Sequence, residues 1–512
     1  MTLITFRKVL SGLFFLLFLM LFAGGERLSA ILSGILPPFQ FVPALLRTLA
    51  QPAALFAAGL IGIVVLTLIF GRVYCSFLCP LGALQDLLIA ASRKIGLRPR
   101  HAYRPPNNLL RYAILAVAAG ALVAGFQSAV SLLDPFAWWG RLVTDFVLPL
   151  LTGSYNLAIL AGKPFDLYLH PRQTPFITPP ALALSAAFLA LIVYLALTRG
   201  RLYCNTVCPV GAFLGLLARF SLFRFAAEKN ACTECARCAE VCKAGCIDPQ
   251  NAAIDMSRCV ACFNCLDACA RTTIRYRPQI PAVRFEDWSP ARRRVVLGGF
   301  AGGLALTLAS FAGLRQMLRI PSAKAQTPVT PPGSGNLARF TSRCCACSLC
   351  VAACPTAVLA PSFADYGTGA LLQPKLNYEQ SYCDYECNVC GRVCPTGAIA
   401  DLALAEKKLI AIGEAKLLED ICVVYVNKTN CGACGEVCPT HAMRFEDREN
   451  ILYPEVDQRY CIGCGACQLA CPTTPRSIVV EPHKTHKRAE KYPEPARRPA
   501  PPPTASGDDF PF

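Results

Sequence analysis

The chain has 512 residues, of which 54 % are hydrophobic, and it carries 30 cysteines and a formal net charge of +17. This length exceeds one domain, and this apolar composition excludes a wholly soluble protein. Disulfide scaffolds are short secreted domains, whereas these cysteines fall in tight groups that mostly end in Cys-Pro, so metal ligation is the better interpretation. The positive charge lies largely in short loops beside apolar segments and in the tail, which is typical of membrane topology rather than of nucleic-acid binding.

Four apolar segments in the first 200 residues predict transmembrane helices, because each approaches the ~20 residues that cross a bilayer. Arg7 and Lys8 at the start of the first segment place the N-terminus in the cytoplasm, and seven Lys or Arg residues in the loop at 71–111 indicate a second cytoplasmic segment. The connection at 127–179 is nearly neutral and carries Trp138 and Trp139, which suit a membrane interface, so we expect it outside. The predicted helices span residues 6–23, 53–70, 109–126 and 181–197.

An internal repeat follows the second and the fourth of these segments. Residues 72–83 and 201–212 share Arg, Tyr, both Cys, Pro, Gly and Ala at matching positions. The repeat predicts two related helical hairpins, each of which places one Cys-x3-Cys-Pro motif at the cytoplasmic surface. Free cysteine is often simply buried, but the duplication of seven identities favours a function. The redox candidates are Cys75, Cys79, Cys204 and Cys208.

Eight cysteines at 232–269 repeat the pattern Cys-x2-Cys-x2-Cys-x3-Cys, which is the spacing of a bacterial two-cluster ferredoxin. In that arrangement three neighbouring thiolates hold one cubane, and the fourth cysteine reaches the other cluster. Lys243 stands where proline usually follows the fourth cysteine, and Cys246 is an alternative ligand to Cys242. We predict one 4Fe-4S cluster on Cys232, Cys235, Cys238 and Cys269, and a second on Cys259, Cys262, Cys265 and Cys242.

A segment of a different kind separates two cysteine-rich parts. Three consecutive arginines precede an uncharged run at residues 295–314, which is long enough to cross a bilayer. The last two arginines with Val-Val-Leu approximate a twin-arginine export signal, and Ala-Lys-Ala at 323–325 supplies a small-x-small cleavage site. An ordinary signal anchor is the alternative. Either interpretation predicts that the two cysteine-rich parts face opposite compartments.

Four further cysteine groups lie between residues 344 and 471. The first and fourth keep the regular spacing, the second has one extra residue in its first gap, and the third needs Cys422 as a distant first ligand, with Cys345 left over. The groups exchange their last cysteines either as first with second and third with fourth, or as first with fourth and second with third. The sixteen predicted ligands of four more 4Fe-4S clusters are Cys344, Cys347, Cys350, Cys354, Cys383, Cys387, Cys390, Cys394, Cys422, Cys431, Cys434, Cys438, Cys461, Cys464, Cys467 and Cys471.

Six clusters without an evident substrate pocket indicate an electron conduit. The sequence has no Cys-x2-Cys-His for haem c, no histidine inside a predicted span for haem b, and no Gly-rich or phosphate-binding loop for nucleotides. A lipid-soluble quinone is the two-electron partner that remains. The predicted fold class is mixed, and its parts are a polytopic α-helical membrane domain (1–225), an α+β bacterial-type ferredoxin domain (226–280), a signal or anchor helix (289–325), a four-cluster ferredoxin domain (337–482) and a disordered tail (483–512).

On these motifs the first 280 residues resemble NapH, the membrane component of the quinol dehydrogenase of periplasmic nitrate reductase. The remainder resembles NapG and MauM, exported ferredoxin-type proteins that share the stretched third motif. The resemblance implies a multi-pass protein of the bacterial inner membrane with ferredoxin domains on its cytoplasmic and periplasmic sides. It implies a component of a quinol dehydrogenase chain, which passes electrons to a periplasmic cytochrome c or reductase.

Related membrane modules also occur in NosR proteins, so a second function stays open. In that interpretation the chain is a redox maturation or reactivation factor for a periplasmic metalloenzyme such as nitrous oxide reductase. In both cases about 30 Å of hydrocarbon separates the two predicted ferredoxin domains. Either the quinone pool carries electrons across, or the four repeat cysteines form an additional iron-sulfur centre or a pair of redox-active disulfides.

Overall fold

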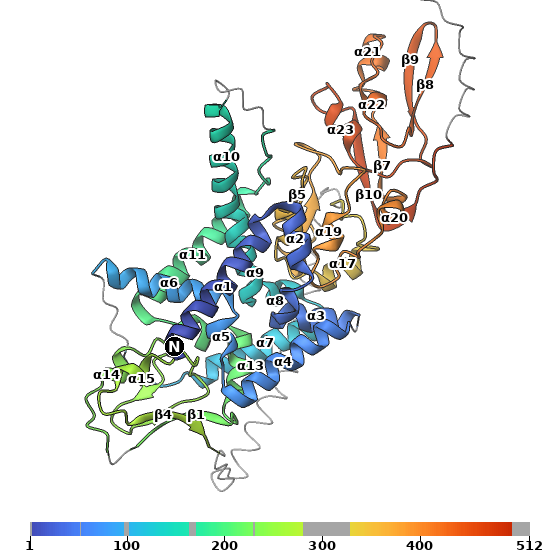
Figure 1. Cartoon of the computed structure of the whole chain (residues 1–512). Helices are drawn as coiled ribbons and strands as arrows, with labels where there is room; N and C mark the ends of the chain where they lie inside the picture. Colours follow the sequence, from blue (N-terminus) through green and yellow to red (C-terminus); the bar gives the residue numbers. More distant parts are fainter. Residues whose placement is uncertain are drawn as a thin grey trace, which may run out of the picture.

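The computed structural model describes residues 3–51, 53–96, 102–162, 170–228, 231–279 and 328–493. These residues form a helical domain, a first cysteine-rich domain at 223–279 and a second cysteine-rich domain at 328–493 (Figure 1). The predicted signal or anchor helix at 289–325 lies entirely outside the described residues, and so does the chain beyond residue 493.

Helices make up the described part of the N-terminal domain. In chain order they are α1 (Leu3–Ala23), α2 (Gly25–Ser33), η1 (Pro37–Phe39), α3 (Phe41–Ala50), α4 (Ala54–Phe70), α5 (Tyr74–Phe77), α6 (Pro80–Lys94), α7 (Asn108–Val123), α8 (Gln127–Leu133), α9 (Pro135–Leu142), η2 (Val143–Val147), α10 (Leu148–Gly162), α11 (Pro179–Arg199), α12 (Leu202–Thr206) and α13 (Pro209–Ala218). The four segments predicted as helices correspond to α1, α4, α7 and α11.

Three helices in the described part of the chain are long and apolar enough to cross a membrane. They are Leu3–Ala23, Pro135–Gly162 and Pro179–Arg199, whereas α4 and α7 have 17 and 16 residues and are shorter. Pro135–Gly162, which combines α9, η2 and α10, is an addition to the predicted set. It falls in the connection at 127–179 that was predicted to lie outside, because its few charges nearly cancel and it carries Trp138 and Trp139.

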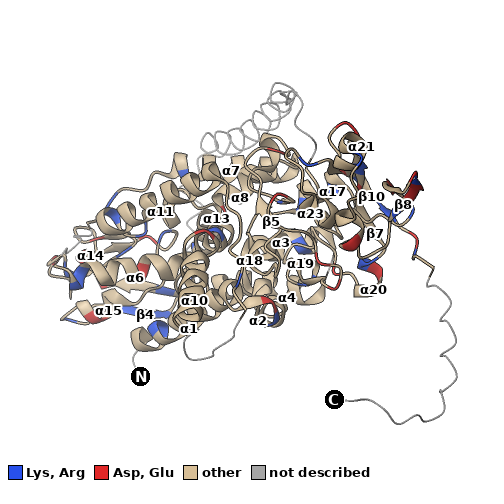
Figure 2. Ribbon diagram, turned by 90° about the horizontal axis from the view of Figure 1, so that it is seen from above, with Lys and Arg blue, Asp and Glu red and all other residues tan. Residues whose placement is uncertain are grey.

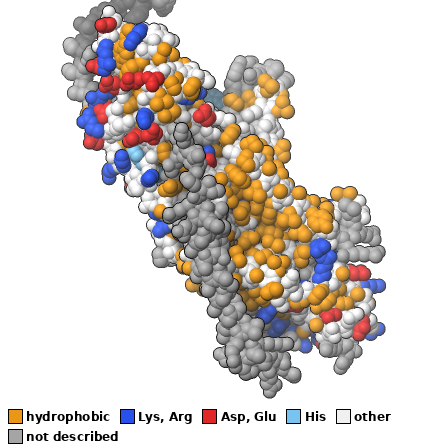
Figure 3. Space-filling model, turned by 180° about the vertical axis from the view of Figure 1, so that it is seen from behind, with side chains coloured by type: hydrophobic (Ala, Val, Ile, Leu, Met, Phe, Trp, Pro, Cys, Tyr) orange, Lys and Arg blue, Asp and Glu red, His pale blue; other side chains and the backbone are white. Residues whose placement is uncertain are grey.

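Trp138 and Trp139 do not lie at a surface, so their predicted place at a membrane interface is wrong. Trp138 is 2 % exposed and Trp139 is 3 % exposed. The Trp138 ring stacks on Phe188 of α11, with ring centroids 3.7 Å apart. The apolar surface is instead supplied by the helices themselves, and Figure 3 shows hydrophobic side chains over the middle of the molecule between two ends that carry charges. A surface of this kind indicates contact with lipid or with another protein.

The first cysteine-rich domain is small and nearly two-fold. Strand β1 (Phe223–Ala227) pairs antiparallel with β4 (Ile274–Pro278), and β2 (Ile247–Asp248) pairs antiparallel with β3 (Ala253–Ile254). Two short helices, α14 (Arg237–Glu240) and α15 (Asn264–Ala268), complete it and contact each other.

The second cysteine-rich domain has two parts. The part nearer the helical domain contains α17 (Leu337–Arg343), α18 (Leu349–Ala352), β5 (Leu359–Pro361), η6 (Thr368–Ala370), β6 (Pro374–Leu376) and α19 (Val389–Arg392). The farther part contains α20 (Leu404–Lys407), β7 (Ile410–Leu417), α21 (Val423–Asn427), α22 (Ala433–Glu436), β8 (Met443–Arg448), β9 (Ile451–Val456), α23 (Ala466–Ala470) and β10 (Ile478–Arg488).

The disordered tail was predicted to begin at residue 483, and this boundary is wrong. Strand β10 continues to Arg488 and pairs antiparallel with β7, with Lys487 opposite Ala411 and Arg488 opposite Ile410. The Lys- and Arg-rich composition suggested disorder. It is compatible with a strand here because the sheet has only two strands, so that many side chains of β10 stay partly exposed.

The helical domain lies between the two cysteine-rich domains (Figures 1 and 2). On one side the Ser76 hydroxyl donates a hydrogen bond to the carbonyl of Val260 at 2.5 Å. On the other side Arg141 Nε donates to the carbonyl of Ala346 at 3.0 Å, and the Ser128 hydroxyl donates to that of Thr368 at 2.8 Å. Charged side chains gather toward the two ends of the molecule in Figure 2, while the helices between them carry few.

Candidate redox centre and cluster sites

The four cysteines of the repeat lie in the interior of the protein. Cys75 and Cys204 lie in α5 and α12, and Cys79 and Cys208 directly precede α6 and α13. Each is 5 or 6 % exposed. They pack in one core with Val260 and Cys262 of the first cysteine-rich domain, so the two motifs form a buried joint between the domains.

The two copies of the repeat hold each other through exchanged arginines. Arg72 of the first copy donates from Nη2 to the carbonyl of Cys204 in the second copy, at 2.9 Å. Arg201 of the second copy donates from Nη1 to the carbonyl of Cys75 in the first, at 2.7 Å. Both arginine side chains are fully buried. The shared arginine of the repeat therefore builds a crosswise clamp around the cysteines.

Local packing also explains why both copies of the repeat have glycine and proline at the same positions. A Cβ added to Gly82 would overlap the carbonyl oxygen of Cys75, and one added to Gly211 would overlap that of Cys204. Pro80 and Pro209 occupy the first turn of α6 and α13, where a missing N–H is harmless. The cysteine before each proline is then the N-cap residue of its helix.

The thiols are close enough to influence one another. Burial raises the pKa of Cys208, and negative charge on Cys204, Cys75 or Cys79 raises it further, while the Gly211 N–H lowers it by donating to the sulfur at 3.4 Å. Burial also raises the pKa of Cys79 and of Cys204. A metal centre at this place would have to displace thiol protons, and the two buried arginines would offset the charge of the thiolates.

Asp86 ties this joint to its surroundings. Its carboxylate oxygens form ion pairs with nitrogen atoms of Arg7 at 2.6 Å, Arg201 at 2.9 Å and Lys243 at 3.0 Å. Burial alone would raise the pKa of Asp86, but the three cations together hold it well below its usual range. Lys243 is the residue that replaces the expected proline after Cys242. It connects the first cysteine-rich domain to the helical domain, which explains the departure from the ferredoxin pattern.

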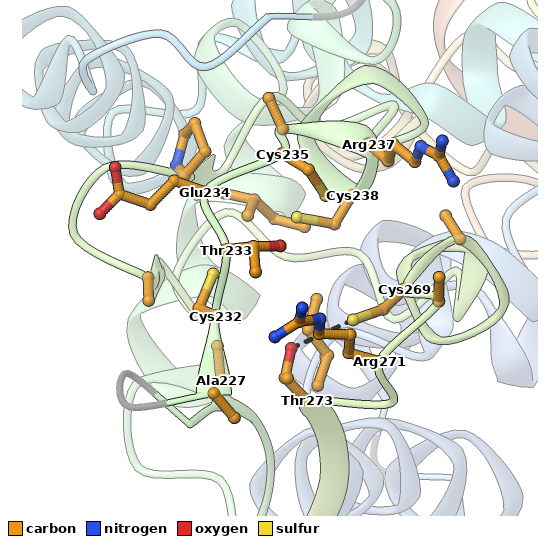
Figure 4. Close-up of a pocket in the computed structure, with 18 of the residues that line it drawn as sticks. Ala227, Cys232, Thr233, Glu234, Cys235, Arg237, Cys238, Cys269, Arg271 and Thr273 are labelled. Carbon is orange, nitrogen blue, oxygen red and sulfur yellow. Dashed lines mark hydrogen bonds between the residues drawn. The ribbon is translucent and has the colours of Figure 1, made fainter.

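In the first cysteine-rich domain each predicted ligand set surrounds a common space, although no group of three or more described His, Cys, Asp or Glu side chains is close enough together to hold a metal ion. Cys232, Cys235, Cys238 and Cys269 line one cavity of about 230 Å³, and their sulfurs face it in Figure 4. The Cys269 sulfur and the Thr273 hydroxyl are 3.1 Å apart.

The other predicted set is gathered around Cys265. Burial raises the pKa of Cys265, and charge on Cys262, Cys259 and Cys242 raises it further. The Cys246 sulfur lies 3.6 Å from that of Cys242, so it borders the same set. The structure thus places Cys246 beside Cys242, and either sulfur remains a candidate for the fourth ligand.

In the second cysteine-rich domain the structure brings adjacent groups together. Burial raises the pKa of Cys344 and Cys350, and charge on Cys394 raises both further. Burial likewise raises the pKa of Cys383 and Cys390, and charge on Cys354 adds to this. In the first two groups the last cysteine of each therefore lies with the first three of the other, as adjacent pairing requires.

In the third and fourth groups, too, the last cysteine of each lies with the first three of the other, around two small cavities. One cavity is lined by Cys422, Cys431, Cys434 and Cys471, and the other by Cys438, Cys461, Cys464 and Cys467. The distant Cys422 therefore lies with the third group, as its spacing predicts. The spacing allowed two pairings of the four groups. The described cysteines lie together as the adjacent pairing requires, first group with second and third with fourth.

One continuous core links the repeat cysteines to both cysteine-rich domains. It includes Cys262 and Val260 of the first domain and Cys345 and Cys347 of the second. Between the repeat and the second domain, the Tyr203 hydroxyl donates to the carbonyl of Leu133 at 3.3 Å. Four thiols thus lie inside the protein between two sets of predicted cluster sites.

Two family models describe iron-sulfur domains in this chain. A 4Fe-4S binding domain matches residues 52–98, 180–228 and 389–410, and a 4Fe-4S dicluster domain matches residues 429–474. The first two matched segments each contain one copy of the repeat. No solved structure matches the chain significantly.

Curated relatives point to one group of proteins. The chain is 31 % identical over 223 residues to the methylamine utilization ferredoxin-type protein MauN of Methylorubrum extorquens, covering 43 % of this chain and 64 % of MauN. It is 28 % identical over 244 residues to the ferredoxin-type protein NapH of Escherichia coli, covering 44 % of this chain and 70 % of NapH. It is also 28 % identical to the protein NirI of Paracoccus denitrificans, over 39 % of this chain and 25 % of NirI.

The chain is thus similar to NapH-like ferredoxin-type proteins over less than half of its length. The resemblance to NapH stated from its motifs is confirmed, and the chain contains 4Fe-4S binding domains. The mixed fold class, with apolar helices and ferredoxin domains, is confirmed as well. The NapH-like chain spans just under two thirds of the length of the MauN proteins that it matches.

Sequence reasoning missed several residues that build the site of this NapH-like chain. Asp86 carries no motif, and the departure at Lys243 is explained only by the 3.0 Å contact between the two side chains. Arg141, from a segment predicted to be an external loop, stacks 4.4 Å over Trp138 and bonds to the Cys344–Cys347 loop. The arginine shared by both copies of the repeat was the one visible signal, because it is duplicated with the cysteines.

Proposed function

We propose that this NapH-like protein is a membrane-bound conduit that oxidises quinol and passes electrons through its iron-sulfur domains to a periplasmic acceptor. The observation that supports the proposal is the place of the four repeat cysteines. They lie in one buried core with cysteines of both cysteine-rich domains. A redox centre there shortens the gap that direct tunnelling between the predicted compartments would otherwise have to cross.

The cofactors of the proposal are six 4Fe-4S clusters and one further centre. When bound, such clusters carry one electron each, and their potentials are set by charge, by hydrogen bonds to sulfur and by exposure. The cluster ligands are the twenty-four cysteines predicted from spacing, with adjacent groups exchanging their last cysteine. Cys75, Cys79, Cys204 and Cys208 hold the further centre, with Arg72 and Arg201 offsetting its charge.

The same proposal assigns the first cysteine-rich domain to the cytoplasmic side and the second to the periplasmic side. The chain would lie in the bacterial inner membrane, with the quinone pool as its electron donor. A cytochrome c or a reductase would accept electrons from the second domain. Reporter fusions at Arg277 and at Phe340 should therefore report opposite sides of the membrane, and a shared side would overturn this topology.

The decisive variant is Cys79→Ser combined with Cys208→Ser. We expect quinol-linked reduction of the clusters in the second domain to be abolished in membrane vesicles, because the relay loses half of its ligands. The purified variant should retain about 24 irons per chain, four for each of six cubanes. Full transfer in this variant would reject the relay and leave the quinone pool as the carrier.

The matched control is Cys246→Ser combined with Cys345→Ser, which also removes two buried cysteines. Both lie outside the proposed ligand sets, so transfer and iron content should be retained. Loss of about four irons in Cys246→Ser alone would identify Cys246, not Cys242, as a cluster ligand. Transfer far slower than respiratory flux in the unaltered protein would favour the maturation-factor alternative.

A further inference from the structure

A small basic pocket lies where two apolar helices meet the first cysteine-rich domain. It has a volume of about 110 Å³ and lies between the start of α7, the end of α11, and the loops around Gly245 and Arg258. A water molecule occupies roughly 30 Å³ of liquid, so the pocket has room for a group of a few heavy atoms, such as phosphate, and not for a nucleotide. Nothing in the proposed electron path uses it.

The lining of the pocket is positively charged. It contains Arg104, Arg111, Arg199 and Arg258 and no acidic residue. Within the described ranges only Arg258 is paired with a carboxylate, that of Asp255 at 2.8 Å. The adjoining residues 97–101, Leu-Arg-Pro-Arg-His, add no acid in sequence. The pocket therefore carries an excess of positive charge.

Two of these arginines have buried nitrogen atoms with no hydrogen-bond partner among the described residues. They are Nε of Arg111 and Nη2 of Arg258, and the two residues are 2 % and 6 % exposed. The other guanidinium nitrogens of Arg111 are engaged, for example Nη2 with the carbonyl of Ser257 at 2.8 Å. A buried donor without a partner is costly, so an external acceptor would be stabilised here. The N-terminus of the 16-residue α7, capped by Asn107, adds its partial positive charge.

Apolar side chains stand beside the pocket. Leu109 is 85 % exposed and Leu110 is 44 % exposed, and both follow the pocket residue Asn108 in α7. On α11, Leu191 and Tyr194 are 46 % and 57 % exposed, one to two turns before the pocket residues Thr198 and Arg199. A basic pocket at helix ends with an exposed apolar surface beside it matches a lipid that has an anionic headgroup and acyl chains.

We propose that this pocket binds the phosphate of an anionic phospholipid, whose acyl chains lie along α7 and α11. The bound lipid joins the two helices to the loop of the first cysteine-rich domain through Arg111 and Arg258. It thereby helps to hold that domain against the repeat cysteines. The site is independent of the identity of the redox centre and would exist even if the electron path were different.

The test uses the purified full-length protein with Arg104→Gln and Arg199→Gln combined. These two side chains make no ion pair within the described ranges, so their loss should leave the fold intact. We expect the unaltered protein to retain phosphatidylglycerol in native mass spectrometry, and the variant to bind it about 30-fold more weakly, from the usual contribution of two arginines near an anionic lipid surface. The control is Arg93→Gln with Arg219→Gln, two exposed arginines outside the pocket, which should retain the lipid.

Thermal unfolding distinguishes the possible sources of phosphate. Phosphatidylglycerol should raise the midpoint of unfolding in the unaltered protein and in the control, but not in the pocket variant, and phosphatidylcholine should not raise it. An equal rise with inorganic phosphate would overturn the lipid assignment in favour of a free anion. An equal loss of lipid in the control and in the pocket variant would overturn the site itself.

Discussion

The two copies of the repeat have the same local geometry but different partners. In the second copy Arg201 donates from Nε to Asp86 at 2.9 Å, so its charge is balanced inside the protein. In the first copy Arg72 donates to the Asn205 side-chain oxygen at 2.8 Å and to the carbonyl of Ser257 at 3.2 Å, and among the described residues it has no carboxylate partner. Duplication therefore conserves the clamp around the cysteines and leaves one copy with an unbalanced charge beside them.

This difference assigns separate tasks to the two arginines. The pair formed by Arg201 and Asp86 also holds Arg7 of α1 and Lys243 of the first cysteine-rich domain. It fixes one domain to the other. Arg72 faces neutral acceptors and lies 3.7 Å from the Cys75 sulfur, so its charge is available to a thiolate. In the proposed centre both arginines offset thiolate charge, but only Arg201 shares its charge with Asp86 and so also joins the domains.

Asp86→Asn should have the largest effect on stability, because it removes the carboxylate from three buried cations. We expect the free energy of unfolding to fall by about 3–5 kcal/mol, as when one partner of a buried pair is lost. The measurement is the shift in thermal unfolding of the full chain in detergent. Asp255→Asn is the control, since its side chain is 31 % exposed and meets the single cation Arg258. Equal losses in both variants would show that the Asp86 network has no special role.

Gly82→Ala and Gly211→Ala test the shared part of the geometry. Each new methyl group would overlap a cysteine carbonyl, so we expect each variant to lose about 1–3 kcal/mol and to assemble the repeat centre poorly. The two losses should be similar, because the two contacts are equivalent. Gly62→Ala in α4 is the control, since an added Cβ has no heavy atom within 4 Å. A variant at either repeat glycine that behaves like Gly62→Ala would break the equivalence of the copies.

The smallest effect is expected from replacing the tyrosines of the two repeat copies, Tyr74 and Tyr203. Tyr74 donates to the Gln40 side chain at 2.9 Å, whereas Tyr203 donates to the backbone of Leu133 next to the second domain. Replacing either by Phe should cost about 1 kcal/mol, the usual net value of one hydrogen bond. We expect only Tyr203→Phe to slow electron arrival in the second domain, measured by stopped-flow reduction. Equal slowing in both variants would contradict a directional path.

Much of this architecture is readable from sequence, because metal ligation imposes fixed spacings. The cysteine groups predicted which residues would meet around Cys232 and Cys269, and the distant Cys422 was assigned from spacing alone. The duplicated Arg, Gly and Pro predicted a symmetric structure. These features are visible in the sequence because each is carried by a short motif with fixed internal spacing, even where two motifs lie far apart in the chain.

Other features depend on contacts between distant segments, which spacing does not encode. Adjacent and nested exchange of cysteines fit the same spacing, and only the packing of the loops distinguishes them. Trp138 and Trp139 were assigned to an interface because tryptophan favours one, but the aromatic side chains of α1 and α11 bury them. The role of Lys243 depends on Asp86, which lies 157 positions earlier in the chain.

The contact between α9 and the Cys344–Cys347 loop constrains the order of biogenesis. A Cβ on Gly140 would overlap the carbonyl of Cys347, and Arg141 holds the carbonyl of Ala346 between the two cysteines. Cys345 and Cys347 are 2 % and 7 % exposed once the domains are joined. An iron-delivery protein would have little access to this loop after docking. The loop should therefore be metallated while the second domain is still separate, so that docking of the domains becomes the last step in the maturation of the chain.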